Sequence, residues 1–230
     1  EQMRNDPRVR LAIPYAVGDS YAGFRIVGTT TAIFTDFSRQ PQGGLRFQAS
    51  GRAFDPDRRE AVLGSIVADR TRMRIGDTFM PYHGMSHDED HQHCHDEYVV
   101  VGVLEPTNSP MDRVIWIPIE GVFRMEGHVL HGTGSPFIPD PAAEIPDEHK
   151  EVSAVLLKLR GPEAGLALRE MIQRAELDCI LMAVNAADRH YLSFIDHLLP
   201  LALEKQMGII GMKVATRGRM LSTWKPEPLE

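Results

Sequence analysis

The most reactive side chains of this sequence gather in one short segment, residues 83–97. The segment holds five histidines, one cysteine and five carboxylates, and it has no lysine or arginine. Imidazole and thiolate groups bind zinc, copper or nickel, and carboxylates can complete or support such a site. On an extended backbone, alternate side chains point to the same side. His91, His93 and His95 are therefore candidate metal ligands.

The same segment also fits an acidic, solvated loop between two strands, in which the histidines are simply exposed. Zinc enzymes usually take their ligands from separate rigid elements, and one loop does not supply such a set. We therefore expect no cofactor beyond weak zinc or copper binding by these histidines. A His-rich metal-binding module remains an alternative function.

Motifs that would identify an enzyme are absent from the sequence. There is no G-x-x-x-x-G-K-[ST] phosphate loop, so the chain is not itself the ATPase of a transporter. There is also no G-x-S-x-G elbow and no H-E-x-x-H helix. The serines, histidines and aspartates show no spacing that favours a catalytic triad. The sequence therefore predicts a protein that is not an enzyme, with no catalytic residues.

Two apolar runs follow the His-rich segment and predict a pair of strands. Residues 98–104 are almost wholly apolar and β-branched, as in a strand that is covered on both faces. Residues 105–112 contain Pro106, Asn108 and Pro110, which favour a turn. A second strand is expected over residues 114–119, so the three parts form a hairpin-like strand, loop and strand.

Other patterns interleave strands with helices. Residues 60–64 predict a short strand, and Ser65 can cap a helix over residues 66–71. Residues 153–160 alternate like a strand with one better buried face. Pro162 then favours the start of an amphipathic helix that continues to about Arg174.

Five blocks of the sequence stand in a recognisable order. They are residues 12–30 (AIPYAVGDSYAGFRIVGTT), 51–54 (GRAF), 60–79 (EAVLGSIVADRTRMRIGDTF), 98–121 (YVVVGVLEPTNSPMDRVIWIPIEG) and 145–172 (IPDEHKEVSAVLLKLRGPEAGLALREMI). Together they resemble the MacB-like periplasmic core domain of ABC transporter permeases. The resemblance covers residues 1–174 and implies an α+β fold with two lobes, built from mixed strands with packed helices.

The resemblance also implies a function and a location. The domain would face the periplasm or extracytoplasmic space as part of a cell-membrane ABC permease. Its partners would be a cytoplasmic ABC ATPase, reached through membrane helices missing from this sequence, and an extracytoplasmic protein, peptide or lipid-linked cargo. The domain would transmit ATP-driven motion to that partner during transport. Residues 127–146, rich in proline and glycine, and the His-rich segment are candidate recognition loops.

The tail resembles a different family. Residues 177–222 are similar to a strand, helix and strand from an aldo/keto reductase barrel. The expected elements are a strand over 179–183, a helix over 191–205 with Leu192, Ile195, Leu199 and Leu203 facing inward, and a strand over 209–214.

None of the catalytic residues of the reductase family has a counterpart here, and one such unit cannot close a barrel. We therefore expect residues 175–230 to form an α/β appendage without reductase activity. A relic reductase fusion remains a second alternative function. A natural fusion, an assembly error or a splice could each give this junction.

Composition is compatible with these expectations. The 230 residues are 43% hydrophobic and 25% charged, which is ordinary for a globular protein. A net charge of -7 argues against a nucleic-acid partner, because phosphate neutralisation needs clustered lysine and arginine. Cys94 and Cys179 are too few to define a disulfide framework, so they do not indicate the redox compartment.

Overall fold

The computed structural model describes residues 3–36, 45–82, 96–124, 145, 150–160, 169–170, 172–174, 177–184, 193–212 and 214. Contacts between residues divide the chain into two compact units. We call Leu11–Leu156 the core unit, and Glu1–Arg10 together with Leu157–Glu230 the terminal unit. No helix within the described ranges is long and apolar enough to cross a membrane.

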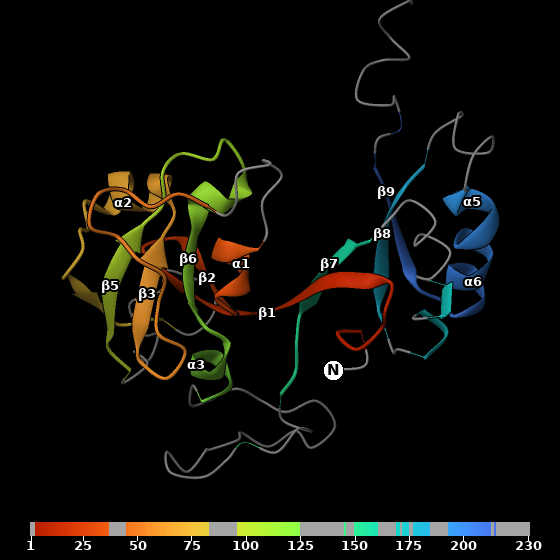
Figure 1. Ribbon diagram of the computed structural model, residues 1–230, viewed down its shortest axis with the longest axis horizontal. Helices are drawn as coiled ribbons and strands as arrows, with labels where there is room; N and C mark the ends of the chain where they lie inside the picture. The colour runs from red at the N-terminus through yellow and green to blue at the C-terminus, as the bar shows by residue number, and fades with distance from the viewer. Residues whose placement is uncertain are drawn as a thin grey trace, which may run out of the picture. The chain divides into compact units, whose positions relative to one another are not determined.

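A mixed seven-stranded sheet is built mainly from residues of the core unit (Figure 1). Its strands, in sheet order, are β4 (Thr78–Phe79), β5 (Tyr98–Val103), β3 (Glu60–Leu63), β6 (Val114–Pro118), β2 (Phe24–Thr29), β1 (Val9–Tyr21) and β7 (Ala154–Leu159). Strands β3 and β5 are parallel, as are β2 and β6, whereas β3 and β6 are antiparallel. Four short helical segments accompany the sheet: α1 (Ala32–Thr35), α2 (Ser65–Thr71), the 3-10 helix η1 (Pro110–Arg113) and α3 (Ile119–Phe123). The predicted α+β fold class is confirmed.

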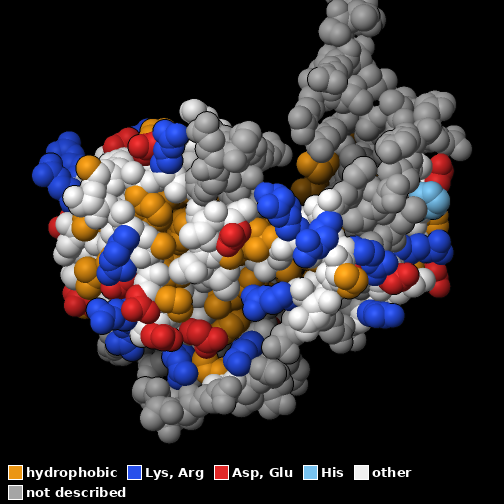
Figure 2. Space-filling view, in the orientation of Figure 1, with side chains coloured by type: hydrophobic (Ala, Val, Ile, Leu, Met, Phe, Trp, Pro, Cys, Tyr) orange, Lys and Arg blue, Asp and Glu red, His pale blue; other side chains and the backbone are white. Residues whose placement is uncertain are grey.

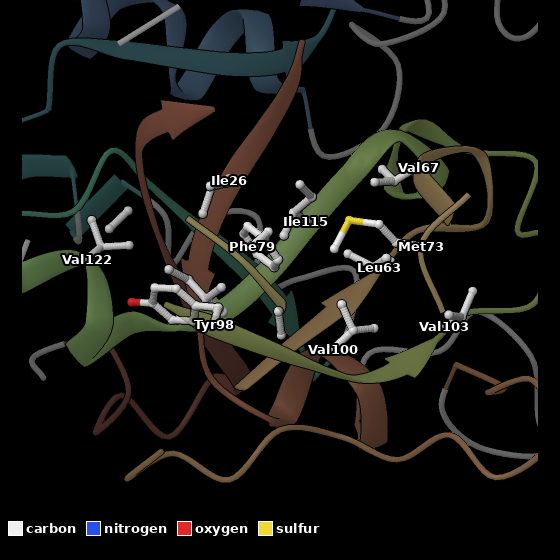
Figure 3. Close-up of a cluster of buried hydrophobic side chains, with 13 residues drawn as sticks. Ile26, Leu63, Val67, Met73, Phe79, Tyr98, Val100, Val103, Ile115 and Val122 are labelled. Carbon is white, nitrogen blue, oxygen red and sulfur yellow. The ribbon is translucent and has the colours of Figure 1, made fainter. Parts of the chain in front are cut away.

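Apolar side chains cover both faces of this sheet. Alternate residues of β6 show the pattern, since Ile115 and Ile117 belong to one buried cluster and Trp116 to the other. The first cluster, shown in Figure 3, packs against α2 and α3 through Val67 and Val122. The second contains Ile33 and Phe34 of α1 and packs against side chains of residues 45–54. Two-sided burial explains why the central strands are apolar at successive positions.

The strands predicted over residues 98–104 and 114–119 are present as β5 and β6. They do not form a hairpin, because β3 lies between them and pairs with both. All four residues of β3 are buried. A strand this apolar is most stable in the middle of a sheet, where both of its edges and both of its faces are covered.

The strand over residues 60–64 is confirmed as β3, but the predicted cap of the next helix is wrong. Gly64 occupies the N-cap position, and Ser65 is the first residue of α2. The Ser65 side chain instead hydrogen-bonds to the Asp112 carboxylate in the turn before β6. A capping serine accepts from a backbone N–H, whereas Ser65 donates its hydroxyl proton to a carboxylate, and hydrogen bonds to an ionised group are the stronger kind.

Asp112 organises the turn between β5 and β6. Its carboxylate accepts hydrogen bonds from the Thr107 backbone N–H at 2.8 Å and the Thr107 hydroxyl at 2.7 Å. Ser109 and Asp112 also form a reciprocal capping box at the start of η1. Burial alone would raise the pKa of Asp112, but these hydrogen bonds outweigh burial and hold it below its ordinary value of 3.8.

The terminal unit contains the strand, helix and strand that the tail pattern predicted. Parallel strands β8 (Cys179–Ala183) and β9 (Gly208–Met212) enclose two short helices in sequence, α5 (Phe194–His197) and α6 (Leu199–Glu204). A buried cluster of Ile172, Met182, Leu198, Leu201, Ala202 and Met207 holds this unit together.

The predicted inward face of the tail helix is wrong at one end. Leu203 is 62% exposed, while Leu201 and Ala202 are buried. The helix is divided at Leu198, with Pro200 in the first turn of α6, so the second segment begins a new helical face. Residues spaced by four also drift around a helix with 3.6 residues per turn. Leu192 lies outside the described residues.

The strand predicted over residues 153–160 is present as β7, but one face is not better buried than the other. Ala154 is exposed and the next five residues are all half-buried, because β7 lies at an edge of the sheet. Most of the helix predicted from Pro162 lies outside the described residues. Its end is helical at residues 169–170 and 172–174.

The expected domain boundary after residue 174 stays a prediction, and truncation tests it. A chain ending after Arg174 should remain folded, because both core-unit clusters lie before that point. It should also be more soluble, because it loses the exposed side chains of Leu181 and Ile210. Circular dichroism should show cooperative thermal unfolding, and limited proteolysis of the full chain should cut first between residues 174 and 189.

A second chain, ending after Arg160, serves as the control. Ile172 belongs to the buried cluster of the terminal unit, so the chain ending after Arg174 exposes this side chain and the chain ending after Arg160 lacks it. Loss of cooperative unfolding in both truncated chains would show that the tail is an integral part of one domain.

Candidate functional site

A pocket of about 570 Å³ opens at one end of the core sheet. Parallel strands β3 and β5 begin at this end, and the antiparallel strand β6 finishes there. The sheet topology therefore brings together three separate segments: the residues before β3, the residues before β5 and the helix α3 after β6. The charged side chains that line the pocket are Asp57, Arg58, Arg59, Asp96, Glu120, Arg124 and Lys150.

An ion pair joins the first two of these segments. The Arg59 Nη2 lies 2.5 Å from the Asp96 Oδ1. The Asp96 side chain is 17% exposed and that of Arg59 is 61% exposed, so the carboxylate is the better enclosed partner. Arg58 makes a longer contact of 3.4 Å with Asp55, between side chains that are both exposed. Along the lower edge of the core unit, acidic and basic side chains lie close together (Figure 2).

Tyr98 lies at the bottom of the pocket. The residue is 1% exposed and its hydroxyl group points toward α3 (Figure 3). Gly121 of α3 makes this approach possible, since a Cβ atom there would lie 2.5 Å from the Tyr98 oxygen. Ile145 and Pro118 are also buried beside the pocket. The pocket thus has a partly apolar base below a charged rim.

A second ion pair fixes the segment that carries Arg58 and Arg59. Arg52 donates two hydrogen bonds of 2.6 Å to the carboxylate of Glu60, one to each oxygen. The Asp55 backbone N–H donates a third, at 2.8 Å. The Arg52 hydrogen bonds are the main cause that holds the pKa of Glu60 below its ordinary value of 4.5, and burial acts against them. The loop before β3 is therefore tied to Glu60, the first residue of the strand, at two points, Arg52 and Asp55.

Residues 1–175 match the family described as the MacB-like periplasmic core domain. The chain belongs to this family. No curated protein matches the chain. The match ends at residue 175, so the resemblance of the tail to an aldo/keto reductase stays a prediction.

The candidate metal ligands of this MacB-like periplasmic core domain, His91, His93 and His95, lie outside the described residues. The recognition loop expected over residues 127–146 also lies outside them, apart from Ile145. Within the part of the chain that the structure describes, no group of three histidine, cysteine or acidic residues could hold a metal ion. The metal site stays a prediction.

Equimolar zinc should barely change the thermal stability of the MacB-like domain. Three ligands from one short segment must lose conformational entropy to converge on an ion, and weak binding gives little stabilisation. Differential scanning calorimetry with and without zinc measures the effect. The control is a variant with His91, His93 and His95 replaced by alanine. A large stabilisation that this variant lacks would establish a structural metal site.

The pocket includes residues that the sequence analysis missed. Arg58 and Arg59 stand in a charged run, residues 55–60, just before a predicted strand, and that run was the available signal. Asp96 was noted only as one carboxylate of the His-rich segment. Its pairing with Arg59 depends on β3 and β5 being parallel neighbours, which no local pattern indicates.

Proposed function

We propose that this domain transmits ATP-driven motion from a cytoplasmic ABC ATPase to an extracytoplasmic partner or cargo. The family match over residues 1–175 carries the proposal, because it indicates an extracytoplasmic domain of an ABC transporter permease. The cargo would be a protein, peptide or lipid-linked molecule, and the domain would act in the periplasm or extracytoplasmic space at the cell membrane.

The construction of the core unit supports this role. Its sheet is packed on both faces, and close-packed interiors transmit displacement because they compress little. A domain that passes motion between two partners needs such a rigid centre. The pocket at the end of the sheet supplies a surface on which a partner could act.

Among its described residues, the pocket lacks the nucleophile and the histidine of the common hydrolase triads. Its described lining contains no serine, cysteine or histidine, and Asp96 is held by Arg59. Turnover of a small molecule by the purified chain, lost when pocket residues are changed, would contradict the proposal that the domain is not an enzyme.

Coupling can be tested in membrane vesicles that contain the permease with this domain and its ATPase. Envelope proteins retained by the immobilised domain supply the candidate partner. Coupling between two sites is reciprocal, so a non-hydrolysable ATP analogue should change the affinity for the partner by about 5-fold or more. The partner should change the affinity for the nucleotide by the same factor. If the nucleotide leaves the affinity for the partner unchanged, and the partner leaves the affinity for the nucleotide unchanged, the proposal is wrong.

A further inference from the structure

The pocket at the end of the core sheet has a positive excess in a chain that is negative as a whole. Its described lining has four basic side chains, Arg58, Arg59, Arg124 and Lys150, against three acidic ones, Asp57, Asp96 and Glu120. The whole chain carries a net charge of -7. Clefts lined by an excess of one charge raise the local concentration of ligands of the opposite sign.

Two of these basic side chains retain hydrogen-bonding capacity. A guanidinium group has five N–H donors. Arg59 uses Nη2 to reach Asp96 and is 61% exposed, and Arg58 is 71% exposed and, among the described residues, pairs with Asp55 at 3.4 Å. A guanidinium group with accessible N–H donors matches the planar, bidentate geometry of a carboxylate.

We infer that this pocket binds a carboxylate-bearing segment of a peptide, through Arg58 and Arg59. The acidic side chains of the rim favour a peptide over a phosphate group, because Asp96 and Glu120 repel a doubly charged anion but can accept hydrogen bonds from peptide N–H groups. Tyr98 and Ile145, which are 1% and 3% exposed, close the base of the pocket. A volume of about 570 Å³ lies within the usual range of ligand sites.

The loop backbone that carries the two arginines is anchored before a ligand arrives. Glu60 fixes Arg52 and the Asp55 backbone, and these two residues lie on the same loop as Arg58 and Arg59. Such an arrangement lowers the entropy lost on binding. The inference rests on the proposed function, since it names the chemistry of the extracytoplasmic partner.

The test uses the full chain and a fluorescein-labelled, C-terminally amidated serine-rich peptide with a single glutamate, and the same peptide with glutamine at that position is the matched control. Fluorescence anisotropy should show that the glutamate peptide binds at least about 10-fold more tightly. The double variant Arg58→Ser with Arg59→Ser should weaken that binding by about 10-fold or more. The double variant Arg70→Ser with Arg74→Ser changes the net charge equally at exposed positions outside the pocket, and it should leave binding unchanged.

Several results would overturn the inference. They are equal binding of the two peptides, equal weakening by the two double variants, and displacement of the peptide by inorganic phosphate or by vesicles rich in anionic phospholipid. Circular dichroism confirms that both double variants are folded. If the glutamate peptide does not bind but nucleotide still changes the affinity for the envelope partner, the inference is wrong and the proposed function stands. If the peptide binds as expected but nucleotide has no effect, the coupling function is wrong.

Discussion

Replacing Arg52 with methionine should destabilise the core unit by about 2 to 3 kcal/mol near neutral pH. The Glu60 side chain is only 8% exposed, and Arg52 donates two of the three hydrogen bonds to its carboxylate. The substitution leaves a buried negative charge that keeps only the Asp55 N–H. We place the expected loss below the full cost of breaking a buried ion pair, because Arg52 is 54% exposed and its charge is screened by water.

The pH dependence of the loss follows from the lowered pKa of Glu60. A carboxylate whose pKa is lower in the folded protein contributes stability above its ordinary pKa, here 4.5. That contribution disappears as the pH falls through the folded value, which lies below 4.5. The difference between the wild type and Arg52→Met should therefore be largest near neutral pH and shrink in acid. Urea unfolding at a series of pH values measures it.

Two further variants control this experiment. Arg58→Met removes an exposed partner at 3.4 Å and should cost less than about 1 kcal/mol. The double variant Arg52→Met with Glu60→Leu should recover much of the stability lost by Arg52→Met alone, because it removes both charges. If Arg52→Met and Arg58→Met prove equally mild at neutral pH, the Glu60 carboxylate does not depend on Arg52.

Replacing Gly64 with alanine should cost about 3 kcal/mol or more. Gly64 links β3 to α2, and a Cβ atom there would overlap the backbone of Asp112 and come within 2.5 Å of the Met111 carbonyl oxygen. These atoms belong to the turn that Thr107, Ser109 and Asp112 fix by hydrogen bonds. A backbone held in this way cannot move aside as a flexible side chain can, so strand and turn must separate.

Thermal and urea unfolding of Gly64→Ala measure this cost. Gly211→Ala is the matched control, because its Cβ would meet Val184 at an ordinary contact distance of 3.6 Å. The control should change stability by no more than about 0.5 kcal/mol. An unfolding midpoint for Gly64→Ala equal to that of the wild type would show that the strand and the turn are not in close contact.

The two ends of the core sheet thus differ: one is closely packed and the other carries the pocket. At one end, the turn organised by Asp112 packs closely against Gly64. At the other, the chain leaves a pocket whose charged rim combines residues before β3, residues before β5 and the helix after β6. Substitutions at the first end are expected to act on folding. Changes to the exposed Arg58 and Arg59 at the second end are expected to act on binding.

The sequence by itself determined the local elements of this protein and its family. The β-branched runs at residues 98–104 and 114–119 became β5 and β6, and the short apolar run from residue 60 became β3. These predictions succeed because a strand with both faces buried needs apolar side chains at successive positions, whatever its neighbours are. The ordered blocks likewise indicated the MacB-like family, and the match over residues 1–175 confirms it.

Only the tertiary structure decided which elements are neighbours, and therefore where the pocket lies. The insertion of β3 between β5 and β6 places Arg59 beside Asp96, although neither residue stands in a recognisable motif. The Ser65 side chain turns to Asp112 rather than capping its own helix, and Leu203 faces solvent rather than the core. The spacing of apolar residues along the sequence indicates which face of its own helix or strand a residue occupies. Strand order and partner choice depend instead on contacts between residues distant in sequence, which no local pattern encodes.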